Sequence, residues 1–233
     1  PGLCDVQEIQ QGQERILQIG ALATLGSCRR HPAILANWPL LSDVCVQIAA
    51  PAVRSRATIG GNIANGSGDM IPALVAMDTD LIWFEGKAIK LQPIGDCLEA
   101  SVGTRSTSPH ILTGIRIRKR DLSRKEVTIY KKVGRREAFI PALISVAAYG
   151  LQNENDEIKR IRLAVGGGDN RPQRLRESEN FLRGKVPDPG VWRELHYKLL
   201  DEIRPASDCF ASADYRRLVA ANLLVAELMY AFR

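Results

Sequence analysis

The sequence contains few of the residues from which metal sites are built. Its 233 residues include only five cysteines and three histidines. No two cysteines form a C-x-x-C pair, and none lies near a histidine at metal-ligand spacing. We therefore expect no metal site, no iron–sulfur site and no catalytic residue of the cysteine–histidine type in this chain. Scattered, unpaired cysteines are typical of reduced thiols in a cytoplasmic protein.

Long apolar runs and aromatic residues are also scarce. The longest apolar stretch, residues 138–151, is too short to cross a bilayer and contains Pro141. The chain opens without the charged and apolar segments of a secretion signal. The net charge of +6 would suit a polyanion, but aromatics make up only 6% of the residues and do not alternate with the basic ones. We expect no membrane span, no nucleic-acid partner and a cytoplasmic location.

Hydrophobic periodicity predicts an α+β protein. In a first unit we expect strands over residues 15–21, 81–85, 88–91, 111–118 and 127–133, and helices over residues 27–37, 40–50 and 71–77. Asp69 is a candidate N-cap of the last of these helices, because Pro72 suits a first helical turn.

A second unit is expected after a boundary near residue 137. Residues 142–152 and 157–165 should form a hairpin, residues 166–172 a loop, and residues 175–183, 191–204 and 215–232 three helices. In the last helix, Leu218, Leu224 and Leu228 share one apolar face. The predicted division is residues 1–137 and 138–233.

The most informative segment is residues 54–69, RSRATIGGNIANGSGD. Gly60 and Gly61 lack Cβ atoms, so the backbone could take positive φ and bring its N–H groups close to a ligand. Thr58 and Asn62 add a hydroxyl and an amide, which suit the phosphate, ribityl or ring edge of a nucleotide cofactor. Glycine pairs are more often simple turns. The pattern alone therefore leaves both a cofactor loop and a plain turn open.

The string ATIGGNIANGS, followed by Asp69 and Pro72, resembles the flavin-binding loop of the molybdenum hydroxylases, the family of xanthine dehydrogenase and carbon monoxide dehydrogenase. The likeness extends over essentially the whole chain, with further matches at Ile19-Gly20-Ala21, Thr24, residues 111–115 (ILTGI), Tyr130, Lys132, Arg136 and residues 212–216 (SADYR).

This resemblance implies a fold and a set of cofactor contacts. The fold is the second subdomain of a type-2, PCMH-like FAD-binding domain, with an antiparallel sheet and helices. It is followed by a small antiparallel sheet with helices, similar to the C-terminal domain of the carbon monoxide dehydrogenase flavoprotein. A first subdomain with a glycine-rich pyrophosphate loop is expected before Pro1. The implied cofactor-binding residues are Thr58, Ile59, Gly60, Gly61, Asn62, Asp69, Leu112 and Lys132.

The resemblance also implies an oxidoreductase function. FAD in this chain would take electrons from iron–sulfur clusters and pass them to an acceptor. The 2Fe–2S clusters and the molybdenum cofactor are expected in partner chains, an iron–sulfur subunit and a molybdopterin subunit, and the complex could form a higher oligomer. The missing pyrophosphate loop leaves a second reading open, a non-flavin assembly or docking module. Neither the substrate nor the acceptor can be identified from the sequence.

The roles of several basic residues stay open at this point. Lys132 would stabilise an anionic flavin or its phosphate, or be an ordinary strand lysine that reaches for solvent. Its neighbour Lys131 should point to the opposite face of the strand. Arg135 and Arg136 could border the flavin or lie in a solvated loop, and Ile48 could cover the cofactor or belong to the core.

Overall fold

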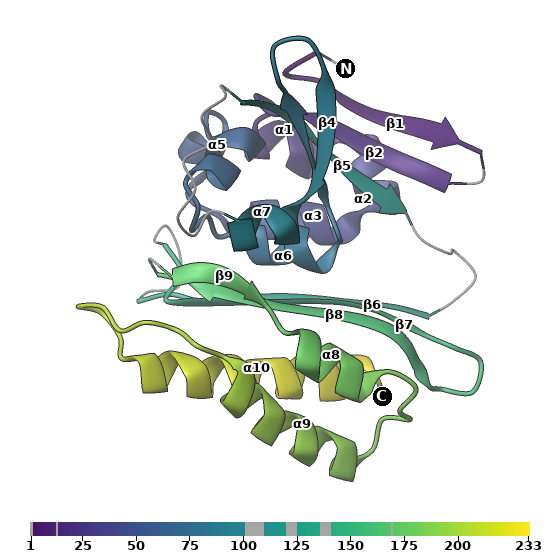
Figure 1. Ribbon diagram of the computed structural model, residues 1–233, viewed down its shortest axis with the longest axis vertical. Coiled ribbons are helices and arrows are strands. Elements are labelled where there is room, and N and C mark those ends of the chain that lie inside the picture. The colour runs from purple at the N-terminus through teal and green to yellow at the C-terminus, as the bar shows by residue number, and fades with distance from the viewer. Residues whose placement is uncertain (1, 13, 101–109, 120–124, 136–140, 169) are drawn as a thin grey trace.

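The computed structural model describes residues 2–12, 14–100, 110–119, 125–135, 141–168 and 170–233. The chain forms two units, within residues 2–119 and 125–233, and each is built on an antiparallel sheet. Figure 1 shows four layers in order: the first sheet, a layer of helices, the second sheet and a further layer of helices. This arrangement has the α+β class that the sequence predicted.

The first sheet has five strands in the order β1-β2-β5-β3-β4. Four of them, β2 to β5, coincide with predicted strands, whereas β1 was not predicted. β1 is an edge strand that is mostly exposed, so its sequence has no clear apolar alternation. The strands are β1 (Val6–Gln11), β2 (Glu14–Gly20), β3 (Asp80–Phe84), β4 (Ile89–Pro93) and β5 (Ile111–Lys119).

The second sheet differs from expectation at both edges. Its strands are β6 (Lys125–Val133), β7 (Ile144–Gln152), β8 (Ile158–Gly167) and β9 (Asn170–Arg174), in sequential order. β6 was expected in the first unit, but it pairs with β7 along its whole length. β9 was predicted as part of a loop. It tolerates Pro172 because it is an edge strand, where a missing N–H costs no ladder bond.

The helices of the first unit are shorter than predicted. They are α1 (Leu25–Arg30), α2 (Pro32–Asn37), α3 (Pro39–Gln47), α4 (Pro51–Arg54), α5 (Ile59–Ala64), α6 (Ile71–Ala76) and α7 (Ile94–Ala100). The predicted helix over residues 27–37 is broken at His31, which has ψ 125°. A residue before proline is driven towards extended backbone, and Pro32 follows it. The helix predicted over residues 40–50 ends at Gln47, because Ala49 takes φ 51°.

Helix α6 lies between the two sheets, and all six of its residues are buried. The predicted N-cap role of Asp69 is wrong. Met70 occupies that position, without a side-chain hydrogen bond. The Asp69 carboxylate is instead bound by Lys132 of the second sheet. Asp69 therefore makes a contact between the two units and does not cap the helix that follows it.

The outer helical layer of the second unit consists of α8 (Arg176–Leu182), α9 (Pro189–Glu202) and α10 (Ala213–Ala231). In α10, Leu224 and Leu228 are fully buried against the second sheet. Leu218, predicted on the same face, is wrongly assigned, since it is 49% exposed. No helix among the described residues has the length and apolar character that crossing a membrane requires. The predicted boundary at residue 137 falls outside the described residues.

Candidate functional site

A large cleft opens where the two units meet. It encloses about 1320 Å³ of free space, open mouth included, which is ample for a cofactor. The first unit contributes apolar and polar groups that include Ile48, Val53, Asn62 and Asp69. The second unit contributes the opposite wall, with Arg135, Ala142, Leu143, Gly168 and Phe210 among its residues.

Asp69 forms a fixed point at the junction of the two units. Its Oδ2 atom lies 2.5 Å from Lys132 Nζ, and its Oδ1 atom accepts a 3.2 Å hydrogen bond from the backbone N–H of Ala142. The Tyr130 hydroxyl donates to the Asp69 carbonyl oxygen at 2.9 Å. Burial, and then the nearby Asp69 charge, raise the pKa of Tyr130 well above its ordinary value. The tyrosine therefore remains a donor at neutral pH.

The start of helix α5 carries most of the predicted cofactor residues, but its N–H groups are already in use. Ile59 N donates to Ala23 O at 3.0 Å, and Gly60 N donates to Ala21 O at 2.8 Å. The Thr58 side chain caps the helix by accepting from Gly61 N at 3.0 Å. These first-turn N–H groups are therefore not free to bind a phosphate.

The glycine pair is also used differently from expectation. Gly60 and Gly61 both lie within helix α5, and neither has positive φ, so that prediction is wrong. A Cβ atom on Gly60 would lie 2.8 Å from Ala21 Cβ, closer than real side chains approach. Gly60 thus allows α5 to pack against the segment after β2. Gly61 has only the Thr58 hydroxyl near its missing Cβ atom.

Asn62, the next residue of α5, does reach the cleft. Its Oδ1 atom accepts a 3.2 Å hydrogen bond from Met70 N, which fixes the orientation of the amide. The Nδ2 atom makes no hydrogen bond within the part of the chain that the structure describes. Asn62 therefore presents two unused N–H donors on a side chain that is held in place.

The remaining predicted residues lie in different places. Lys132 sits beneath Asp69, with 11% of its side chain exposed. Leu112 is half-buried in β5 opposite Trp83, away from the cleft lining. Ile48 lines the cleft, and Arg136 lies outside the described residues. The structure thus brings Asn62, Asp69 and Lys132 together.

Of the wall from the second unit, sequence reasoning named only Arg135 as a possible neighbour of the flavin, and Arg135 lines the cleft. One fully buried side chain, Arg216, builds this wall by donating to Leu143 O at 3.0 Å, to Gly167 O at 3.1 Å and to the Asp208 carboxylate. The backbone N–H of Phe210 binds Asp208, as do Ala211 and Arg216, and together they lower the pKa of that carboxyl. The family match at residues 212–216 includes Arg216, but no local pattern assigned it to the cleft, because only the fold of the second unit joins these residues.

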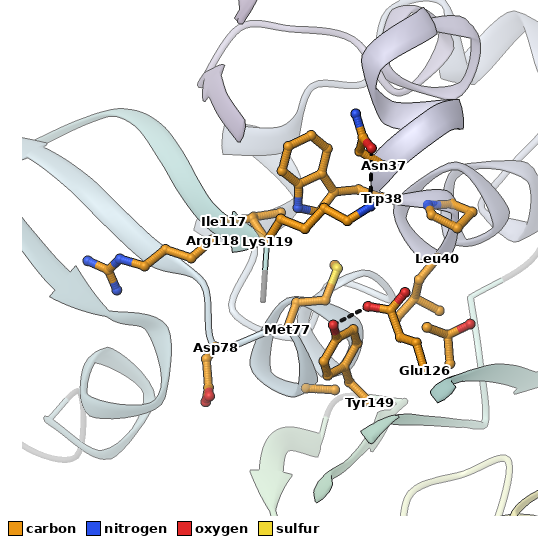
Figure 2. Close-up of a pocket in the computed structure, with 13 residues that line it drawn as sticks. Asn37, Trp38, Leu40, Met77, Asp78, Ile117, Arg118, Lys119, Glu126 and Tyr149 are labelled. Atoms are coloured by element: carbon orange, nitrogen blue, oxygen red, sulfur yellow. Dashed lines mark hydrogen bonds between the residues drawn. The ribbon is translucent and has the colours of Figure 1, made fainter. Parts of the chain in front are cut away.

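A smaller hollow of about 430 Å³ also lies between the units, next to the end of β5 (Figure 2). Figure 2 shows the Tyr149 hydroxyl bonded to Glu126 and Lys119 Nζ bonded to Asn37, the latter at 3.1 Å. Its polar side chains are therefore largely satisfied by one another. None of the predicted cofactor residues lines it. The larger cleft is the better candidate for a cofactor site.

Comparison with known proteins identifies the family. The family described as "FAD binding domain in molybdopterin dehydrogenase" matches residues 2–118. The chain belongs to this family. A second family, described as "CO dehydrogenase flavoprotein C-terminal domain", matches residues 128–231. The two matches correspond closely to the two units of the structure.

Individual relatives of this molybdopterin dehydrogenase FAD-domain protein are consistent with the family assignment. The glyceraldehyde dehydrogenase medium chain of Sulfolobus acidocaldarius is 29% identical over 209 residues, covering 89% of this chain and 73% of its own length. The nicotine 6-hydroxylase medium subunit of Paenarthrobacter nicotinovorans is 25% identical, with 96% of this chain and 76% of its own length covered.

Solved structures show the same fold. The match to a Cu,Mo-CO dehydrogenase has a TM-score of 0.85 at 22% identity, and covers 99% of this chain and 78% of the other. The match to quinoline 2-oxidoreductase from Pseudomonas putida 86 has a TM-score of 0.83 at 21% identity, with the same coverage. The predicted fold class, the FAD cofactor and the oxidoreductase function are confirmed. The protein is an FAD-binding subunit or domain of the molybdenum hydroxylase family.

Proposed function

We propose that the cleft between the two units holds the flavin, with Asn62 and Asp69 facing it. The single observation that carries this proposal is the oriented Asn62 amide, which lines this cleft and whose two N–H donors are unused by the described residues. Apolar side chains of Ile48, Val53 and Leu143 supply surface for a planar ring. This combination of apolar walls and a few fixed polar groups fits a flavin.

FAD, when bound, supplies the redox chemistry by accepting electrons and releasing them to an acceptor. The residues of this chain bind it, orient it and exclude water from one side. Lys132 does not act as a free positive charge, because Asp69 neutralises it, and we assign it the role of orienting Asp69. Thr58, Ile59, Gly60 and Gly61 support Asn62 by fixing the start of α5.

We further infer that the chain passes electrons from iron–sulfur clusters, through FAD, to an acceptor. The clusters and the molybdenum cofactor would be held by an iron–sulfur subunit and a molybdopterin subunit in the cytoplasm. Support comes from relatives described as medium chains or subunits. One similar structure is described as a carbon monoxide dehydrogenase from Hydrogenophaga pseudoflava that lacks the Mo-pyranopterin moiety of the molybdenum cofactor. Leu112 as a cofactor contact and the division at residue 137 stay predictions.

The proposal is tested by titrating the protein with FAD and following flavin fluorescence. Asn62→Asp keeps the Oδ1 acceptor for Met70 N but replaces the two N–H donors with negative charge. We expect its FAD dissociation constant to rise about tenfold or more. Asn155→Asp, on an exposed turn that does not line the cleft, is the matched control and should bind FAD like the wild type. Equal affinity of the Asn62 variant and the wild type would overturn the assignment.

A further inference from the structure

An arginine and a phenylalanine from different segments are stacked at the mouth of the cleft. The guanidinium carbon of Arg135 lies 4.0 Å from the centre of the Phe210 ring. Both residues line the cleft, and both are exposed, Phe210 at 55%. The cleft therefore carries an exposed aromatic ring with a cation over one face.

The Phe210 turn is held in position although its ring is exposed. Its backbone N–H donates to Asp208 Oδ1 at 2.8 Å, and the Ala211 N–H donates to the same atom at 2.9 Å. The other carboxylate oxygen is bound by Arg216, which is fully buried and tied to two backbone carbonyls of the cleft wall. The turn that carries the ring is therefore already ordered. Binding a ligand there should need little further loss of backbone entropy.

The two acidic residues described in the cleft are paired with cations other than Arg135. Asp69 is neutralised by Lys132, and Asp208 is neutralised by Arg216. Among the described residues Arg135 has no acidic partner, and its guanidinium group stacks on the Phe210 ring. A stacked guanidinium keeps its in-plane N–H donors available for a carboxylate or sulfonate. The mouth of the cleft thus combines an apolar ring surface with a cation that no described acidic residue pairs.

We propose that Arg135 and Phe210 form a subsite for a planar, anionic electron acceptor of the quinone class. The inference rests on the proposed flavin site in the same cleft. The deeper polar groups, Asn62 and Asp69, suit a resident cofactor, whereas an exposed pair at the mouth suits a ligand that exchanges with solvent. In each turnover the acceptor gains two electrons and two protons from the reduced flavin, so that the quinone becomes a hydroquinone and the flavin is reoxidised.

The test compares two probes that differ in charge, naphthoquinone sulfonate and unsubstituted naphthoquinone. Their binding to the oxidised, FAD-loaded protein is measured by quenching of flavin fluorescence, and the FAD content of each variant is measured separately. Arg135→Gln removes the charge and keeps most of the side-chain length, and Phe210→Leu removes the ring. Arg233→Gln is the matched control, because Arg233 also lies over an aromatic ring, that of Tyr230, but does not line the cleft.

We expect Arg135→Gln to weaken binding of the sulfonate about tenfold and to leave the neutral quinone within about twofold. Phe210→Leu should weaken both probes, and Arg233→Gln neither. Higher salt should reduce the advantage of the sulfonate in the wild type, because the subsite is exposed.

Three results would overturn the inference. Equal changes for the two quinones in Arg135→Gln, or no change, would show that the charge does not select the acceptor. A loss of FAD affinity with unchanged quinone binding would show that Arg135 holds the cofactor instead, which leaves the proposed function intact. A wild-type protein that binds no FAD would refute the proposed function, and the acceptor subsite with it.

Discussion

Lys132 Nζ lies 2.5 Å from Asp69 Oδ2, and this ion pair joins the second sheet to the segment that leads into helix α6. Only 11% and 13% of the two side chains are exposed. The pair therefore sits at the base of the cleft, between the two units. Removing one partner would leave the other charge buried without compensation. Such a change lowers the free energy of unfolding strongly.

Lys132→Met should lower the free energy of unfolding by about 3 kcal/mol, measured by urea denaturation. The matched control is Lys131→Met on the same strand. Lys131 points to the opposite face, as predicted from strand geometry, and contacts Glu227 with its side chain 50% exposed. Its loss should cost less than about 1 kcal/mol. Equal losses for the two variants would show that the Lys132 pair contributes no more than a surface ion pair.

The two glycines of α5 should respond differently to alanine. Gly60→Ala would force a Cβ atom against Ala21, and should cost about 1–3 kcal/mol while lowering FAD content. Gly61→Ala gains helix propensity and meets only the Thr58 hydroxyl, so its effect on stability should stay within about 1 kcal/mol. Thermal unfolding and flavin release measure both effects. Similar melting temperatures for the two variants would contradict the packing role of Gly60.

Helix α10 provides a test of the second core. Leu224→Asp places a charge where no side-chain surface is exposed, and should destabilise the protein by about 4 kcal/mol or more. Glu227→Lys loses the contact with Lys131 and should cost about 1 kcal/mol at most. Leu218→Asp should also be tolerated, because this residue is exposed. Comparable urea midpoints for the Leu224 and Leu218 variants would refute the assignment of the buried face.

The cysteines should divide into reactive and unreactive thiols. Burial raises the pKa of Cys28 to about 12 and that of Cys45 further still, so neither forms the reactive thiolate at pH 8. Cys4 and Cys209 are exposed and should react with a thiol reagent first. Because both buried pKa values are raised, the reactivity of Cys28 and Cys45 in the native protein should increase only as the pH rises well above 9. Mass spectrometry of the labelled peptides identifies the sites, and rapid labelling of Cys28 at pH 8 would contradict its burial.

The sequence predicted most strands well because alternation survives wherever one face of a sheet is buried, as in β5 with Ile115 and Ile117. The break at His31 was predictable too, since the residue before Pro32 avoids helical backbone. The contact between Lys132 and Asp69 could not be predicted, because it spans 63 positions of the chain. It takes the Asp69 carboxylate away from the capping role that the local sequence suggested.

Asn62 and Asp69, both expected as cofactor contacts, do line the cleft. They lie within one segment, which was singled out by its resemblance to the family's flavin-binding loop. The opposite wall depends on Arg216, which connects Leu143, Gly167 and Asp208 only in the folded protein. The positive φ expected of the glycine pair was wrong, because a helix N-terminus and a positive-φ turn can carry the same residues.

The location of the flavin is tested most directly by a crystal structure of the FAD-loaded protein. The account predicts electron density for the flavin in the cleft between the two units, within hydrogen-bonding distance of Asn62 Nδ2 and bordered by Leu143 and Gly168. Flavin density elsewhere, with this cleft filled only by solvent, would contradict it.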